Sequence, residues 1–216
     1  MIARTLSAGL AGVALISLAL GCERGTPAST VLAAKTAGLS PNFSASASNH
    51  HMRWDLLNVD FATRTASAGG IASARANDGS EITITGSGTF RSNPGNPQDV
   101  TGGGSWTTYA SGGSVTGSGT YEVTGFVSYV LAPGTFPLPN DNIGNPADGR
   151  AGLLVVRVAY SDGSEGSLVV SCNFAGTATA DVFEGVTASK GRTGFWNRAA
   201  AAPGVEGNRT AFHVID

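Results

Sequence analysis

Residues 70–90 read GIASARANDGSEITITGSGTF, and this stretch decides the fold class. Apolar and polar residues alternate on both sides of Asn77, Asp78 and Gly79, as they do in two half-buried β-strands. An Asp-Gly pair between two such runs is a strong hairpin signal, because glycine readily adopts the positive φ of a tight turn. The stretch therefore predicts an antiparallel hairpin formed by residues 70–76 and 80–90.

The same arrangement occurs twice more along the chain. Residues 103–109 and 114–131 flank the turn signal ASGG at 110–113, and residues 151–160 and 165–175 flank SDGS at 161–164. Further strands are expected at residues 53–61, 182–189 and 208–215. Strands joined by short turns in this way predict an all-β domain, an antiparallel meander of about eight or nine strands.

A short glycine-rich repeat indicates how this sheet is shaped. TGSGTF at residues 85–90 recurs as TGSGTY at residues 116–121. Glycines inside strands mark bends or a close approach of backbone, and a sheet needs such bends to close on itself. Closure also removes the exposed strand edges that promote aggregation. We therefore expect a closed or nearly closed barrel, with a two-sheet β-sandwich as the alternative.

One strand is expected to be covered on both faces. Residues 153–160, LLVVRVAY, are apolar on both faces except at Arg157, which is the pattern of a strand packed on two sides. The outer cover is expected to come from the N-terminal segment, from the proline-rich loop at 133–150 or from residues 191–202. The last of these is expected to form a short helix or an irregular cap.

Composition excludes one function class. Charged residues make up 13% of the chain, the net charge is −2, and no basic cluster occurs. A nucleic-acid-binding protein needs a positive surface to neutralise phosphates, so we expect no nucleic-acid partner.

The N-terminus has the features of an export signal. Arg4 precedes an apolar run from Leu6 to Leu20, which is short for a membrane span. The run ends at Ala19-Leu20-Gly21-Cys22, which resembles the lipobox of bacterial lipoproteins. The resemblance implies that Cys22 is lipidated and attaches the protein to a membrane of the cell envelope. Ordinary signal cleavage and secretion is the alternative.

This reading gives a domain plan. Residues 1–21 are expected to be the signal peptide, residues 22–50 a flexible tether rich in Ala, Ser and Thr, and residues 51–216 a single β domain.

No standard catalytic motif is present in the sequence, and we expect no catalytic residue, metal or cofactor. Cys172 lies on the apolar face of a predicted strand and is expected to be a buried core residue. His50, His51 and His213 are expected to be structural or solvated residues. The oxygen-rich loop at 140–148 is expected to form turns, with Ca²⁺ binding as the less favoured alternative.

Five residues are the candidate ligand-binding set. Arg157 is costly to bury without a partner, so it could pair with Glu122 or Glu184 or bind the carboxylate or phosphate of a ligand. Trp106 and Tyr121 could line a pocket for an apolar ligand.

Three functions remain open from the sequence. The favoured one is a binding module for a small apolar molecule or a partner protein. A surface structural or adhesive protein is the first alternative. A barrel-type isomerase, cyclase or lyase is the second, and it requires Arg157, Glu122 and Glu184 to converge in one pocket. The sequence leaves the oligomeric state open.

Overall fold

The computed structural model describes residues 49–174, 183–200 and 207–216. Within these ranges every regular element is a β-strand except one turn of 3-10 helix, η1 (Pro146–Asp148). The strands are β1 (His51–Asp60), β2 (Thr65–Ala68), β3 (Ile71–Arg75), β4 (Glu81–Thr85), β5 (Ser87–Arg91), β6 (Gly103–Tyr109), β7 (Val115–Ala132), β8 (Asn140–Asp141), β9 (Gly149–Tyr160), β10 (Glu165–Cys172), β11 (Gly185–Lys190), β12 (Thr193–Phe195), β13 (Asn197–Arg198) and β14 (Arg209–Val214). The all-β prediction is confirmed. The expected signal peptide and the tether up to residue 48 lie outside the described residues.

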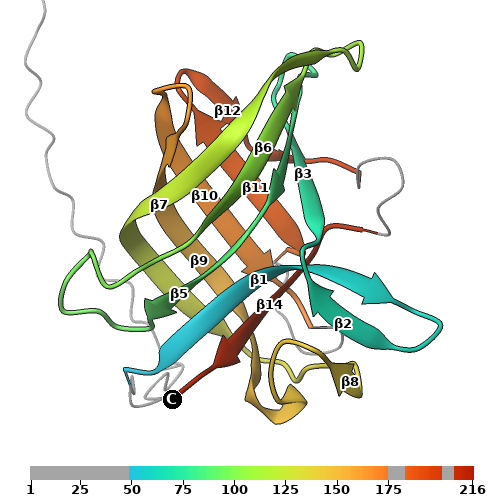
Figure 1. The fold of residues 1–216 in the computed structure, drawn as a ribbon, viewed down its shortest axis with the longest axis vertical. Helices are drawn as coiled ribbons and strands as arrows, with labels where there is room; N and C mark the ends of the chain where they lie inside the picture. Colours follow the sequence, from blue (N-terminus) through green and yellow to red (C-terminus); the bar gives the residue numbers. More distant parts are fainter. Residues whose placement is uncertain (1–48, 175–182, 201–206) are drawn as a thin grey trace, which may run out of the picture. The chain divides into compact units, whose positions relative to one another are not determined.

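Six strands close into an antiparallel barrel in the order β9, β14, β1, β5, β6 and β7 (Figure 1). The ring closes because β7 pairs with β6 on one side and with β9 on the other. The barrel prediction is therefore confirmed, and the sandwich alternative is set aside. Eight further strands lie outside the ring. Strands β10 to β12 continue from β9, strands β4, β3 and β13 continue from β6, and β2 and β8 extend from β1.

The barrel has two distinct ends. Three hairpin turns, at residues 76–80, 110–114 and 161–164, lie at the end that is uppermost in Figure 1, which we call the hairpin end. Strand β8 and the C-terminus lie at the other end, which we call the lower end.

A bend divides the run that the sequence predicts as one strand over residues 80–90. The bend lies at Gly86, whose φ is +157°. Before it, β4 pairs with β3 and β6, and after it β5 pairs with β1. One continuous segment thereby contributes both to the ring and to its extension.

The repeated glycines let indole rings lie against the backbone. A Cβ atom at Gly86 would be 3.2 Å from the ring of Trp54, and Cβ atoms at Gly117 and Gly119 would be 3.2 and 3.1 Å from the ring of Trp106. A buried tryptophan ring thus lies against each copy of the repeat, although the nearest atoms are the hydroxyl oxygens of Tyr121 at Gly86 and of Ser161 at Gly119, each 2.2 Å from the added Cβ.

Aromatic side chains fill much of the barrel interior. The ring centroids of Phe90 and Tyr129 are 4.9 Å apart, and those of Tyr129 and Phe212 are 5.3 Å apart. The indole of Trp54 is completely buried. Close packing of this kind supports stability and leaves the ends and the outer surface as the places for recognition.

The outer faces carry a second, smaller core. Leu57 and Val59 on β1 and Ala211 on β14 pack outside the ring against Phe136 and neighbouring residues of the 133–149 loop. The loop thus covers the outer face of β1 and β14. The described part of the segment 191–202, where a helix or an irregular cap is expected, instead contains the short strands β12 and β13.

Candidate ligand-binding site

A small pocket opens at the lower end of the barrel, with an apolar wall and a polar wall. Its volume is about 140 Å³. The apolar wall includes Leu57 and Val59 of β1 and Phe136 of the covering loop, and the polar wall includes Glu184 and Arg209. These residues come from segments far apart in the sequence, which the barrel closure brings together.

Glu184 is a mostly buried carboxylate directly before β11. It accepts hydrogen bonds from the backbone N–H groups of Asn173 and Thr210, each at 2.7 Å. Burial raises the pKa of Glu184 to about 7, although these hydrogen bonds and the charge of Arg209 oppose the rise. Near neutral pH this side chain therefore exists in both the protonated and the ionised form.

Arg209, the first residue of β14, supplies a cation at the pocket. Its guanidinium carbon lies 5.8 Å from the ring centroid of Phe61, and the residue is exposed. Among the described residues no carboxylate forms an ion pair with it. A guanidinium beside a carboxyl that can carry a proton offers a ligand several hydrogen-bond donors.

Cys172 lies behind Glu184 and is an inert core residue. Its thiol is fully buried and donates to the carbonyl oxygen of Thr210 at 3.2 Å. Burial raises the pKa of Cys172, and the charge of Glu184 adds to this effect. The thiol is thus held in its neutral, unreactive form, and the prediction that Cys172 is a buried core residue is confirmed.

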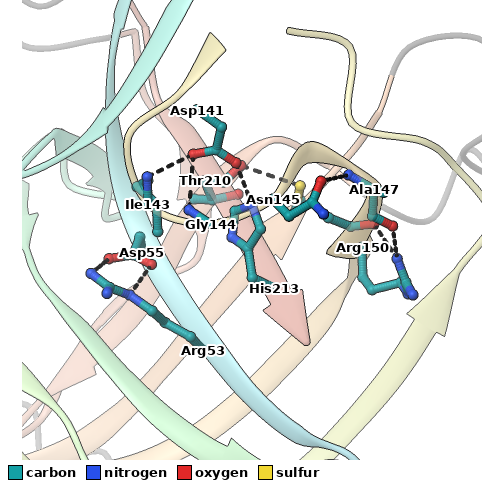
Figure 2. A network of polar contacts seen from close by, with 12 residues as sticks. Arg53, Asp55, Asp141, Ile143, Gly144, Asn145, Ala147, Arg150, Thr210 and His213 are labelled. Carbon is teal, nitrogen blue, oxygen red and sulfur yellow. Dashed lines mark hydrogen bonds and ion pairs between the residues drawn. The ribbon is translucent and has the colours of Figure 1, made fainter. Parts of the chain in front are cut away.

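A buried contact between a histidine and an aspartate holds the loop that contributes Phe136 to the apolar wall (Figure 2). Nε2 of His213 on β14 lies 2.7 Å from Oδ2 of Asp141 on β8, and both side chains are at most 1% exposed. The other carboxylate oxygen of Asp141 accepts the backbone N–H groups of Ile143 at 2.9 Å and of Gly144 at 3.4 Å. One carboxylate therefore fixes both the conformation of the loop and its contact with the barrel.

A second polar pair lies beside the first on the same outer face. Arg53 donates two hydrogen bonds of 2.7 Å to Asp55, whose side chain is completely buried. The hydrogen bond to Asp55 raises the pKa of Arg53 further. Arg53 is directly opposite His213 in the β1–β14 register, so the two pairs form adjacent parts of the network in Figure 2.

The end of the loop is fixed by its own hydrogen bonds. The side chain of Asn145 accepts the backbone N–H of Ala147 at 3.0 Å and caps η1. Arg150 donates to the carbonyl oxygens of Ala147 and Gly149 at 2.9 and 2.8 Å. Phe136, the loop's contribution to the apolar wall, thus belongs to a loop whose second half is restrained by these hydrogen bonds.

The structure does not assemble the predicted ligand-binding set. Arg157 and Glu122 are exposed on the outer face of β9 and β7, whereas Glu184 lies at the pocket of the lower end. The convergence of these three residues, which the barrel-enzyme alternative requires, is not observed. The alternation of β9 correctly places Arg157 away from the core. The outer face was expected to be covered, but it is open to solvent at Arg157.

Trp106 and Tyr121, the two aromatic members of the predicted set, lie in the core. Each donates a hydrogen bond to a backbone carbonyl group. The indole N–H of Trp106 donates to the backbone carbonyl of Thr120 at 3.0 Å, and the hydroxyl of Tyr121 donates to the backbone carbonyl of Thr85 at 2.9 Å. The ammonium of Lys190 lies 4.1 Å from the ring centroid of Trp106. At the hairpin end, the protein's own lysine therefore occupies the face of this ring.

Sequence reasoning found Glu184 but missed its surroundings. Arg209 and Phe136 belong to the pocket, and His213 has a buried carboxylate partner in Asp141, yet no sequence signal was assigned to any of these relationships. The weak signal available was the oxygen-rich loop around Asp141. Its carboxylate binds His213 and the loop backbone, and in the described ranges no group of three His, Cys, Asp or Glu side chains is placed to hold a metal ion.

Comparisons with protein-family models, with curated proteins and with solved structures find no match to this chain. In the part of the chain that the structure describes, no helix is long and apolar enough to cross a membrane.

Proposed function

We propose that this protein is a non-enzymatic binding module that holds a small amphipathic molecule at the lower end of its barrel. The observation that carries the proposal is a buried, protonatable carboxyl beside an unpaired guanidinium at an apolar pocket. Apolar pockets with a few converging polar groups and a perturbed pKa are the usual form of small-molecule sites.

The size of the pocket limits the apolar part of the ligand. A cavity of about 150 Å³ lined by aliphatic and aromatic side chains can hold a benzene molecule, and this pocket measures about 140 Å³. The ligand therefore inserts one ring or a short alkyl chain, and its remaining part extends past Arg209 toward solvent.

The polar groups favour a ligand with a carboxylate. Arg209 attracts a negative charge, and the protonated form of Glu184 can donate a hydrogen bond to an oxygen of the ligand. Ionised Glu184 repels the same group. Since the pKa of Glu184 is about 7, the binding-competent fraction changes between pH 6 and pH 8 from roughly nine tenths to roughly one tenth, so the apparent Kd rises about tenfold.

Calorimetric titration of the processed protein with benzoate and with benzylamine at pH 6 and pH 8 tests this proposal. We expect benzoate to bind more tightly at pH 6, and we expect Glu184→Gln to abolish the pH dependence. Glu165→Gln is the matched control, because Glu165 is exposed on β10. Benzylamine, which carries a positive charge, should bind more weakly than benzoate. Absence of benzoate binding, or benzoate binding that Glu184→Gln leaves pH-dependent, contradicts the proposal.

We further propose that the module is exported and attached to a membrane through a lipid on Cys22. The support is the lipobox-like Ala19-Leu20-Gly21-Cys22 after an apolar run. Mass spectrometry of the N-terminal peptide tests it. A mature chain beginning at acylated Cys22 is expected, and loss of the acyl mass in Cys22→Ser confirms the site. An unmodified Cys22 in the mature protein contradicts it.

An adhesive or structural surface role is the second candidate. It is favoured by three exposed aliphatic side chains near the lower end of β7, namely Val127, Val130 and Leu131, which are 50 to 60% exposed. Self-association that is lost in Val130→Asp would favour this role. The barrel-enzyme alternative loses its support because Arg157, Glu122 and Glu184 do not converge.

A further inference from the structure

A second, larger hollow lies at the opposite end of the barrel and on its outer surface. It measures about 590 Å³ and lies between the turns at residues 76–80 and 110–114. Its lining includes Arg75, Glu81, Thr83, Tyr109 and Ser111. This volume is within the range of small-molecule sites in proteins.

The rim of the hollow is preformed. The amide of Gly79 donates to the carbonyl of Ala76 at 3.1 Å, and the amide of Gly113 donates to the carbonyl of Ala110 at 2.8 Å. The two turns also lie close together, since a Cβ added at Gly79 would be 3.1 Å from Cβ of Ser111. A ligand entering this hollow has little loop ordering to accomplish, which favours binding.

Three side chains form a row across the floor. Strand register places Arg75 opposite Glu81 and Glu81 opposite Tyr109, so all three point to the same outer face. Thr83 is two residues along β4 from Glu81 and shares this face. The row and Thr83 together present a cation, an anion, an aromatic ring and a hydroxyl on this face.

The charges of this row offset each other but leave hydrogen-bonding capacity. Nε of Arg75 donates to Oε1 of Glu81 at 2.9 Å, and Nη2 donates to the same oxygen. A guanidinium has five N–H groups and a carboxylate has two oxygens, so donors of Arg75 and the second oxygen of Glu81 remain for a ligand. Half of the Arg75 side chain and a third of the Glu81 side chain are exposed, at 48% and 31%.

These features favour a neutral, polyhydroxylated ligand. Neighbouring hydroxyls of a sugar need closely spaced donors and acceptors, and the C–H face of a pyranose ring packs on an aromatic side chain. A phosphate or carboxylate would have to approach Glu81, and an apolar chain would leave the Arg75–Glu81 pair desolvated without compensation. We propose that the hollow between these two hairpin turns is a carbohydrate-binding site, with Tyr109 as the stacking residue and the Arg75–Glu81 pair binding hydroxyl groups.

Amide chemical shifts of the full chain, titrated with cellobiose, maltose, diacetylchitobiose and inorganic phosphate, test the proposal. We expect at least one disaccharide to shift the amides of Gly79, Tyr109 and Ser111. Tyr109→Ala should weaken that binding about tenfold or more, whereas Tyr109→Phe should retain it because stacking needs the ring and not the hydroxyl.

Phe61→Ala is the matched control, since Phe61 is an exposed aromatic at the lower pocket. It should leave sugar binding unchanged. Shifts caused by phosphate alone, the absence of shifts with all three disaccharides, or full sugar binding in a folded Tyr109→Ala protein would overturn the proposal. Because benzoate binding is measured at the other end of the barrel, failure of one site does not imply failure of the other.

Discussion

The buried pair of Asp141 and His213 should contribute strongly to stability, and the chain contains its own control. The perturbation is Asp141→Ala. His50 and Asp216 form a second pair with the same 2.7 Å separation, but their side chains are 44% and 45% exposed, against 1% and 0% for His213 and Asp141. Each carboxylate also accepts a backbone N–H, from Ile143 in one case and from His51 in the other.

The magnitude follows from this difference in burial. Removing one partner of a buried pair leaves the other polar group without water or a partner, which costs about 3–5 kcal/mol. For a domain of this size the loss should lower the Tm by on the order of 10 °C. Asp216→Ala should change stability little, because water and salt screen an exposed pair.

Equilibrium unfolding in urea measures the two differences in free energy, with amide hydrogen exchange as the local readout. We expect Asp141→Ala to speed exchange in the 133–149 loop and to weaken benzoate binding, because Phe136 of that loop forms a wall of the pocket. Equal losses for Asp141→Ala and Asp216→Ala would refute the reasoning that burial sets the strength of the pair.

Three further predictions concern single residues. The pKa of Glu184 is raised to about 7 from 4.5. Its contribution to stability is therefore complete below about pH 4.5 and is lost as the pH rises through 7, by on the order of 3 kcal/mol. The free energy of unfolding of Glu184→Gln, measured from pH 5 to pH 8, should change less with pH than that of the parent protein. Gly88→Ala should destabilise by about 1–3 kcal/mol, since its Cβ would lie 2.1 Å from the backbone carbonyl oxygen of Thr101 and 2.6 Å from the indole nitrogen of Trp54; Gly112→Ala, with open space around it, is the control in the same urea assay. Lys190→Ala should destabilise by about 1–2 kcal/mol and change tryptophan fluorescence, because its ammonium lies over Trp106.

Each of these predictions has an outcome that contradicts it. A pH profile of Glu184→Gln as steep as that of the parent protein would mean that another group titrates. Equal stability of the Gly88→Ala and Gly112→Ala proteins would mean that the barrel relaxes around an added methyl group. Unchanged fluorescence in Lys190→Ala would mean that the lysine does not rest on the indole in solution.

Local signals predicted the hairpins accurately because each turn is encoded within a few residues. Each of the three turns contains a glycine with positive φ: Gly79 at 84°, Gly113 at 83° and Gly163 at 84°. The division at Gly86 was not predicted, because the apolar alternation of β4 continues into β5 without a turn signal. The two- and three-residue strands β8, β12 and β13 are too short to show a periodic pattern.

The candidate site was predictable only in part, because its residues meet through the closure of the barrel. Alternation showed that Arg157 and Val158 point to opposite faces of β9, but it did not show that the outer face is open to solvent at Arg157. Glu184 and Arg209 are 25 positions apart in the chain, and no local pattern connects them. The pairing of Asp141 with His213 likewise depends on where the loop folds back.

The tight packing of rings between β5, β7 and β14 has an evolutionary consequence. A barrel whose interior is filled by packed side chains cannot take a new ligand by enlarging that interior without losing the contacts that stabilise the fold. Sequence change that alters ligand recognition is therefore confined to the two ends of the barrel. There the loop held by His213 and the two hairpin turns can vary while the strands between them stay the same.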